Sequence, residues 1–206
     1  MSERLALIDY GAGNLRSVAN ALKAAGATSI DITADAQAVA QADRIVLPGV
    51  GAFAHCMNAL SALPDMVDTL NDAVLKRATP FLGICVGMQL MADTGEEHGT
   101  HQGLGWISGT VKLMDAPSPD IRIPHMGWND VTLSAPHALL ERGEAYYLHS
   151  YHFDAASPQD VLATSHHGRD IVAAVGHDNM VGVQFHPEKS QAFGLALLNR
   201  FLDWKP

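Results

Sequence analysis

A single cysteine stands between two glycines, at a point where an apolar run changes into a helical pattern. The stretch PFLGICVGMQLM, residues 80–91, places Cys85 in the short sequence GICVG. This spacing is typical of a nucleophile elbow, in which a reactive side chain occupies a strained strand-to-helix turn and nearby glycines avoid collisions. A helix N-terminus beneath the thiol would lower its pKa and could bind an oxyanion. On this stretch alone, a buried packing cysteine fits equally well.

A histidine and a glutamate follow another apolar run, in GVQFHPEKSQ, residues 182–191. If this strand remains extended, His186 and Glu188 point the same way, and the carboxylate can orient one imidazole nitrogen while the other faces a thiol. A surface histidine beside a surface glutamate is the alternative. Together with Cys85 at the end of another strand, these residues could supply a nucleophile, a base and an orienting group. The shared position at the strand ends favours the catalytic interpretation.

The elements that must position these residues follow from the hydrophobic pattern. Four short, nearly unbroken apolar runs predict strands buried on both faces, which requires helices on both sides. Apolar residues at helical spacing and Gly or Pro boundaries predict several helices, and short segments between residues 103 and 178 predict a partly antiparallel set. The predicted strands are residues 5–8, 45–47, 81–84 and 181–185, and the predicted helices are residues 15–25, 52–62, 65–77 and 195–202.

These elements predict an α/β fold with a mainly parallel, helix-flanked sheet and additional antiparallel strands. No repeat or linker divides the chain, so we expect one domain over residues 1–206. Ligands in such sheets bind at the carboxyl ends of the strands. Cys85 and His186 both lie at such ends, so the predicted catalytic residues fall where the fold would bind a ligand.

Composition excludes several classes of function. The net charge is −9 without a compensating cluster of Lys and Arg, which argues against nucleic-acid binding. No stretch approaches 18 uninterrupted apolar residues and the N-terminus does not resemble a signal peptide, so we expect no membrane contact and a cytoplasmic location. The two cysteines form no Cys-x-x-Cys pair, which argues against a disulfide framework or a thiolate zinc site.

Neither a metal nor a cofactor site is predicted. Eleven histidines are present, but the pair His98 and His101 lies in a polar loop, and His149 and His152 would point to opposite faces of a strand. In DYGAGNLRS, Arg16 stands where a dinucleotide-binding fingerprint needs its third glycine, and no Walker A motif occurs. We therefore expect chemistry by side chains alone.

Several motifs together carry a family resemblance. GICVGMQLM with QFHPE resembles the class I, or triad, glutamine amidotransferases. DYGAGN, LPGVGAF, IPHMGWN and LHSYH are similar to the glutaminase subunits that serve imidazole glycerol phosphate synthases in histidine biosynthesis. The likeness runs from about Asp9 to Ser190. It implies the fold of that family and hydrolysis of glutamine to glutamate and ammonia. A separate cyclase subunit would use the ammonia to form imidazole glycerol phosphate and an aminoimidazole carboxamide ribotide.

The resemblance also implies a role for each motif. Cys85 would attack the glutamine amide carbon, His186 would move the proton and Glu188 would orient the imidazole. The oxyanion donors would be backbone N–H groups of Val86 and of Val50 or Gly51. The substrate would be bound by residues around these positions, namely Gly49, Gly51, Gly87, Gln89, His149, Ser150 and Tyr151.

The cyclase would form a heterodimer with this chain, and three residues are candidate contacts. Met126 and Trp128 in IPHMGWND could form an apolar partner surface or simply cover a core edge. Asn14 could contact the partner or cap the first helix. Cys56 stands where we expect a small residue in this family, and we interpret it as a packing residue.

Three other interpretations remain open from the sequence. The chain could be the glutaminase subunit of another amidotransferase, because the cysteine and His-Pro-Glu motifs occur throughout the family. It could be a free-standing cysteine hydrolase of peptides or γ-glutamyl compounds, against which Gln89 and IPHMGWN argue. It could also be an inactive binding module on the same fold, against which the intact set Cys85, His186 and Glu188 argues.

Overall fold

The computed structural model describes residues 3–116 and 118–206. In the first half of the chain, strands and helices alternate, and the sequence predicted these elements except for the strand at residues 30–33 and the helix at residues 36–40. The elements are β1 (Leu5–Ile8), α1 (Leu15–Ala24), β2 (Ile30–Thr33), α2 (Ala36–Ala40), β3 (Arg44–Gly49), α3 (Phe53–Ala62), α4 (Met66–Asn71), the π-helix η1 (Asp72–Lys76), β4 (Phe81–Cys85) and α5 (Val86–Gln89).

The second half consists mostly of strands, before a final helix. Its elements are β5 (Ala92–Gly95), β6 (His101–Gln102), β7 (Ile107–Leu113), β8 (His125–Leu133), β9 (Gly143–His149), β10 (Tyr151–Ala155), β11 (Val161–His166), β12 (Asp170–His177), β13 (Met180–Val183) and α6 (Gln191–Asp203). Two short 3-10 helices, η2 (Pro158–Asp160) and η3 (Pro187–Lys189), complete the set within the described residues.

Across the described ranges, the strands form two sheets. The larger has nine strands in the order β2-β1-β3-β4-β13-β12-β11-β8-β9. The pairs from β2 to β13 are parallel, and those from β13 to β9 are antiparallel. The prediction of an α/β fold with a parallel, helix-flanked sheet and additional antiparallel strands is therefore confirmed.

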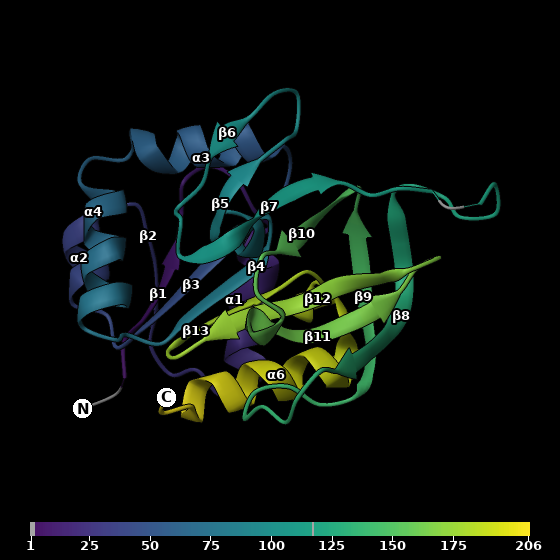
Figure 1. Ribbon diagram of the computed structural model, residues 1–206. Coiled ribbons are helices and arrows are strands. Elements are labelled where there is room, and N and C mark those ends of the chain that lie inside the picture. Colours follow the sequence, from purple (N-terminus) through teal and green to yellow (C-terminus); the bar gives the residue numbers. More distant parts are fainter. Residues whose placement is uncertain (1–2, 117) are drawn as a thin grey trace.

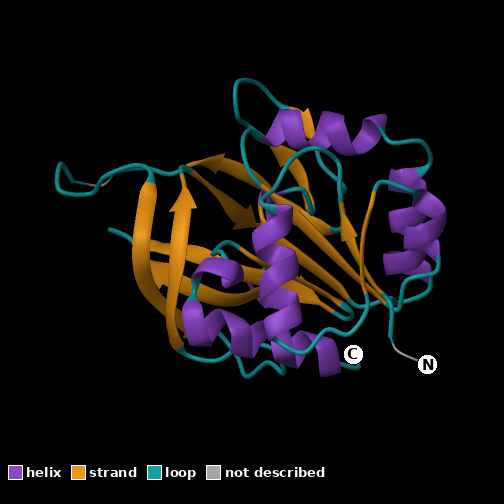
Figure 2. Ribbon diagram, turned by 180° about the vertical axis from the view of Figure 1, so that it is seen from behind, coloured by secondary structure: helices purple, strands orange, loops and turns teal. Residues whose placement is uncertain are grey.

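Helices cover both faces of the parallel half. Helices α1 and α6 lie together on one face (Figure 2), whereas α3 and α4 lie on the opposite side (Figure 1). The strands β1, β3, β4 and β13 are buried along their whole length, which explains their unbroken apolar sequences. One hydrophobic core runs from Leu5 to Trp204 and joins both halves of the chain.

Helix α1 shows how local sequence sets these elements. It buries Val18, Ala19 and Leu22 on one face, and it ends where Gly26 adopts a φ of +114°. The N–H of Gly26 bonds to the Lys23 carbonyl, and the next N–H bonds to the Leu22 carbonyl. This is a Schellman motif, whose left-handed position favours glycine. The predicted glycine stop is therefore present.

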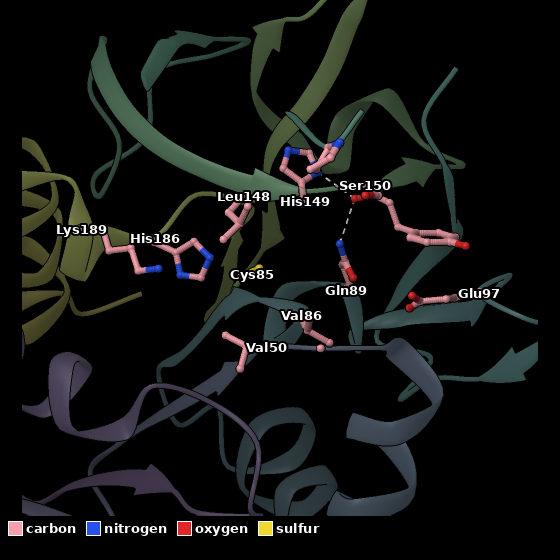
Figure 3. Close-up of a pocket in the computed structure, with 13 residues that line it drawn as sticks. Val50, Cys85, Val86, Gln89, Glu97, Leu148, His149, Ser150, His186 and Lys189 are labelled. Carbon is pink, nitrogen blue, oxygen red and sulfur yellow. Dashed lines mark hydrogen bonds between the residues drawn. The ribbon is translucent and has the colours of Figure 1, made fainter. Parts of the chain in front are cut away.

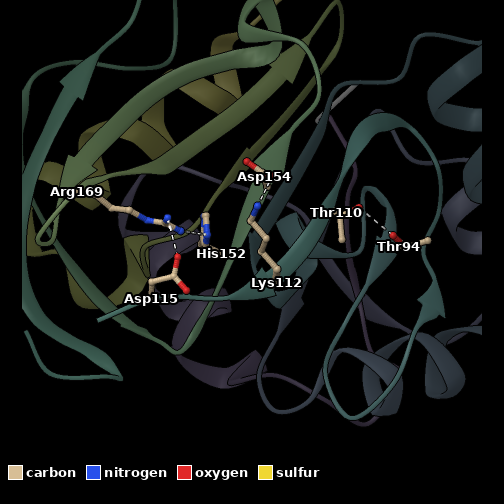
Figure 4. A network of polar contacts seen from close by, with 7 residues as sticks. All are labelled: Thr94, Thr110, Lys112, Asp115, His152, Asp154 and Arg169. Carbon is tan, nitrogen blue, oxygen red and sulfur yellow. Dashed lines mark hydrogen bonds and ion pairs between the residues drawn. The ribbon is translucent and has the colours of Figure 1, made fainter. Parts of the chain in front are cut away.

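The smaller sheet has the order β10-β7-β5-β6 and is tied to the larger one by polar contacts. Within the smaller sheet, Lys112 on β7 pairs with Asp154 on β10. Arg169, in the turn between β11 and β12, donates to the Asp115 carboxylate at 2.9 Å and lies 3.0 Å from His152 Nε2 (Figure 4). The strand β10 therefore contacts both sheets.

Three predicted elements differ from the structure. The predicted helix over residues 65–77 is α4 followed by a π-helical turn. The stretch EAYYLHSY is not one strand: β9 ends at His149, and after Ser150 the chain enters the other sheet as β10. The last parallel strand ends at Val183, not Phe185, because the chain turns there toward η3.

Candidate active site

Three neighbouring parallel strands end at one edge of the larger sheet. β4 lies between β3 and β13, with Gly49 opposite Cys85 and Val183 opposite Ile84. The loop after β3 contains Val50 and Gly51, and the segment after β13 contains His186. Because these strands run in the same direction, their carboxyl ends bring the three motifs together, as the fold class predicts.

Cys85 occupies a strained backbone conformation at the strand-to-helix turn. Its φ is 55° and its ψ is −111°, a combination that a non-glycine residue rarely adopts. Val86 begins α5 directly after it, and the first N–H groups of a helix have no intrahelical acceptor. The thiol therefore stands at a turn of the nucleophile-elbow type, beside backbone donors.

Glycines permit the close packing around this turn. A Cβ atom on Gly49 would lie 2.7 Å from the Gly87 nitrogen, and one on Gly83 would lie 2.7 Å from the Gly87 carbonyl oxygen. A Cβ on Gly87 would overlap the Leu47 carbonyl. The backbones of β3, β4 and α5 thus approach each other where any side chain would force them apart. Gly49 and Gly87 act here in packing and do not line the cavity described below.

His186 and Glu188 form a buried pair beside the cysteine. The imidazole Nδ1 lies 2.9 Å from the Glu188 Oε1, and both side chains are less than 5% exposed. Burial lowers the pKa of His186, but hydrogen bonding to Cys85 and Glu188 outweighs that effect and raises it to about 10. His186 therefore holds a proton at neutral pH, between a carboxylate and a sulfur atom.

The reason for this contact differs from the one inferred from the sequence. Residues 187–189 form the 3-10 helix η3, so Glu188 reaches the imidazole across a tight turn and not along an extended strand. Ser190 stabilises the turn, because its hydroxyl donates to the His186 carbonyl at 2.7 Å and accepts from the Tyr146 N–H at 2.9 Å. The same two residues are brought together by different local geometry.

The loop Pro48–Gly51 is held from behind by two side chains. The Tyr10 hydroxyl donates to the Pro48 carbonyl at 2.7 Å, and the Cys56 thiol donates to the Val50 carbonyl at 3.4 Å. Burial raises the pKa of Cys56 to about 11, which keeps this thiol protonated and able to donate. Cys56 is fully buried on α3, as expected for a packing residue, and it also contacts the loop that follows β3.

A cavity of about 340 Å³ lies above these groups. Figure 3 shows Cys85 between His186 and Lys189 on one side and Gln89 and Glu97 on the other. Most residues predicted to act on the substrate line this cavity: Val50, Gly51, Cys85, Val86, Gln89, His149, Ser150, Tyr151 and His186.

Other residues of this region were missed by the sequence analysis. Glu97, Pro124, Leu148 and Lys189 line the cavity, and Gln184 is buried next to Cys85. Glu97 accepts a hydrogen bond from the Phe53 N–H at 2.8 Å, which fixes its carboxylate at the rim. Its position in a polar loop gave no signal in the sequence. Gln184 lies within QFHPE, in which the sequence analysis assigned chemical roles only to the neighbouring His and Glu.

Two buried histidines support the cavity wall. The Tyr151 carbonyl can only accept, so His149 donates to it from Nδ1 at 2.8 Å, and His149 Nε2 then accepts from His125 Nδ1 at 3.0 Å. Burial lowers the pKa of His125 to about 4 and that of His149 to about 3. Both imidazoles are therefore neutral near pH 7, as this arrangement requires.

These lowered pKa values predict how stability depends on pH. In the unfolded chain both histidines have a pKa near 6.5, so below that pH the unfolded state binds protons that the folded state does not. The free energy of unfolding should therefore fall from pH ~6.5 toward ~4, by up to about 1.4 kcal/mol per pH unit for each histidine.

Urea unfolding across this pH range measures the effect. The His125→Gln variant should show a shallower dependence than the parent, whereas His55→Gln, at an exposed position on α3, should not change the slope. Equal slopes in all three proteins would contradict the assignment of the acid-sensitive groups.

The predicted partner contacts lie outside the cavity. Met126 and Trp128 on β8 are 66% and 47% exposed, and Leu148, opposite Met126 on β9, is 39% exposed. These three side chains form an apolar surface, the β8–β9 surface, that reaches the cavity at Leu148. Asn14 is exposed before α1 and makes no side-chain capping bond, so the capping role is not observed.

No group of three or more His, Cys, Asp or Glu side chains in the described residues is placed to hold a metal ion. None of the helices described is both long and apolar enough to span a membrane.

Comparison with known proteins identifies relatives along the whole chain. A family profile for Glutamine amidotransferase class-I matches residues 6–204. The chain is 60% identical to the imidazole glycerol phosphate synthase subunit HisH of Zymomonas mobilis, over 100% of this chain and 98% of the relative. It is 53% identical to the HisH subunit of Rhodospirillum rubrum, over 98% and 100% of the two chains.

Solved structures agree at the level of the fold. A crystal structure of a glutamine amidotransferase aligns with a TM-score of 0.74 at 17% sequence identity, covering 96% of this chain and 97% of that one. PurLQS from Thermotoga maritima aligns with a TM-score of 0.71 at 16% identity, covering 98% and 99% of the chains.

Proposed function

Since the chain belongs to the class I glutamine amidotransferases, in the group of HisH subunits of imidazole glycerol phosphate synthase, we propose that Cys85, His186 and Glu188 hydrolyse glutamine in the cavity described above. The contact series from Glu188 through His186 to Cys85, at the floor of that cavity, carries this proposal. It supplies a nucleophile, a proton carrier and an orienting carboxylate in the order that acyl transfer requires.

The first half-reaction forms a thioester. The sulfur of Cys85, whose proton resides on His186, attacks the side-chain amide carbon of glutamine. The negative charge that develops on the amide oxygen is stabilised by the N–H of Val86 and by an N–H of Val50 or Gly51. The carbon–nitrogen bond then breaks as His186 transfers its proton to the nitrogen, and ammonia leaves. Glu188 keeps the imidazole oriented and stabilises its charged form.

The second half-reaction releases glutamate. His186, now neutral, removes a proton from a water molecule, and the resulting hydroxide attacks the thioester carbon. The carbon–sulfur bond breaks and the new carboxyl group loses its proton to solvent as glutamate departs, while the proton taken from water remains on His186 opposite the sulfur. The same backbone donors stabilise both tetrahedral intermediates, so one oxyanion site serves both steps.

Charged and polar groups of the cavity match the rest of a glutamine molecule. Glu97 is a carboxylate at the rim, where it can bind an α-ammonium group. Gln89 and the backbone of Ser150 and Tyr151 form the cavity wall near Glu97. The α-carboxylate shares a carbon with the α-ammonium group, so it would lie on this side as well, whereas Lys189 lies on the other side of Cys85. This distribution favours an amino acid over a peptide lacking a free α-amino group.

A partner on the β8–β9 surface would cover the cavity mouth. Ammonia released into water is protonated and diluted, so a sealed contact delivers the neutral nucleophile to an acceptor. We identify the partner as the cyclase subunit of imidazole glycerol phosphate synthase, in a heterodimer with this chain. The reaction would take place in the cytoplasm, because a reducing compartment keeps the free cysteines Cys56 and Cys85 reduced.

Mixing this chain with a purified cyclase subunit tests the proposed function. We expect a one-to-one complex in light scattering, slow glutamate formation by the isolated chain, and faster formation when the cyclase and its phosphoribulosyl acceptor are present. A free-standing hydrolase of γ-glutamyl compounds would instead show full activity alone and no complex at micromolar concentrations. That result would replace the proposal with the hydrolase.

Truncation of the β8–β9 surface should weaken the complex. Trp128→Ala removes a half-exposed aromatic side chain of the type that dominates interface energies, and we expect at least about 10-fold weaker binding of the cyclase. Leu75→Ala is a matched control, because Leu75 is 52% exposed on η1, away from the cavity. Titration of the cyclase with each variant measures the two dissociation constants; equal values would exclude this surface from the interface.

A further inference from the structure

A buried amide contacts the proposed nucleophile and has no role in the mechanism above. Gln184 is fully buried between β13 and His186, and its Nε2 lies 3.7 Å from the Cys85 sulfur. We propose that Gln184 is a further catalytic residue, whose side-chain amide donates a hydrogen bond to the sulfur of Cys85 and stabilises its thiolate. The inference rests on the proposed function in one respect, the role of Cys85 as nucleophile.

The hydrogen-bond network determines which end of the Gln184 amide faces the sulfur. Gln89 Nε2 donates to the Tyr151 carbonyl at 3.0 Å, and a carbonyl oxygen only accepts. The same NH₂ group of Gln89 lies 3.0 Å from Gln184 Oε1. The oxygen of Gln184 therefore faces Gln89, and its NH₂ group is left to face Cys85.

The Tyr151 carbonyl, which determines the orientation of the Gln89 and Gln184 amides, is itself held in place. His149 Nδ1 also donates to it at 2.8 Å, and the His149 ring is held by His125. Asn129 lies 3.0 Å from the far nitrogen of His125. A series of buried donors and acceptors thus runs from β8 to the Cys85 sulfur, and reversing the Gln184 amide would place its NH₂ group against that of Gln89.

The contact suits a thiolate for two reasons. A charged sulfur gains more from a hydrogen bond than a neutral thiol does, so the donor favours the ionised form. An amide also has no proton to lose in the working pH range, so it can donate to the sulfur at every pH in that range. Gln184 does not line the cavity, which separates its effect from glutamine binding. The titratable groups around Cys85 and its cavity are His186, Glu188, Tyr10, Cys56, Glu97, His149, Tyr151 and Lys189.

The test is the pH dependence of Cys85 alkylation by iodoacetamide, followed by mass spectrometry of the peptide that contains Cys85. Only the thiolate reacts, so the midpoint reports its formation. Gln184→Met keeps the side-chain length but removes the donor, and we expect the midpoint to rise by about one pH unit. Gln102→Met, at an exposed site on β6, is the matched control and should leave it unchanged.

Two further variants test the same hydrogen bond. Gln89→Met frees the amide of Gln184 to rotate, and we expect a smaller shift in the same direction. Should Gln184→Met not fold by circular dichroism, Gln184→Asn withdraws the amide by one methylene and should raise the midpoint similarly. An unchanged midpoint in a folded Gln184 variant would overturn the inference. Because glutamine is absent, this outcome is distinct from failure of the proposed function, which would appear as a parent Cys85 that alkylates no faster than a free thiol.

Discussion

Replacing Cys85 by alanine should abolish glutamine hydrolysis and leave the use of external ammonia intact. The variant lacks the sulfur that forms the thioester, and no other thiol lines the cavity in the described residues. The complex with the cyclase should still make product from an added ammonium salt at raised pH, since the proposal puts the acceptor site on the cyclase. Glutamate assays and product assays on the same preparation measure both activities.

The second thiol offers a control for this experiment. Cys56→Ser removes the other sulfur but keeps a hydroxyl donor for the Val50 carbonyl, so we expect activity near that of the parent. Glutaminase turnover well above background in the Cys85→Ala complex would mean that another group is the nucleophile. Loss of the ammonia-dependent reaction would instead indicate that the substitution damages the complex.

Removing the charge of Glu188 should lower turnover by about 10- to 10⁴-fold, a range set by general-base and triad catalysis. In Glu188→Gln the shape is kept, but the buried partner 2.9 Å from His186 becomes neutral and stabilises the imidazolium less. The effect should appear in kcat with little change in KM, because Glu188 does not line the cavity. His186→Ala should cost at least as much.

Steady-state kinetics of the complex measures these changes. Asp31→Asn makes the equivalent substitution at an exposed position on β2, at the opposite edge of the larger sheet from β9, and should have no effect on kcat. A Glu188→Gln enzyme with near-parental kcat would reduce the proposed triad to a cysteine and histidine pair.

Sequence reasoning identified the fold class because the parallel strands are buried on both faces. Runs such as residues 5–8 and 81–84 must be apolar to lie between helices, and glycine marks the end of α1. The division of the strands into two sheets could not be predicted in this way. The break at Ser150 has no Gly or Pro, so EAYYLHSY reads as one strand, and only tertiary pairing moves Tyr151 to the second sheet.

At the site, too, some residues could be predicted from the sequence and others could not. Motif spacing placed Cys85 and His186 at strand ends, and the parallel order of β3, β4 and β13 brings them together. Glu97 and Gln184 lacked any local signal, because their roles depend on contacts with residues distant in the sequence, such as Phe53 and Cys85. Gly49 and Gly87 were predicted to bind substrate, and that role stays a prediction; the structure shows that their lack of a side chain lets the backbones pack closely.

Mass spectrometry of the complex, quenched with acid during glutamine turnover, tests the central claim most directly. If Cys85 forms the proposed thioester, its peptide should carry an added glutamyl group, which should disappear when glutamine is exhausted and be absent from the Cys85→Ala complex. Rapid glutamate formation in the parent complex without any adduct on Cys85, at quench times that span several turnovers and under conditions in which thioesters survive, would contradict hydrolysis through this residue.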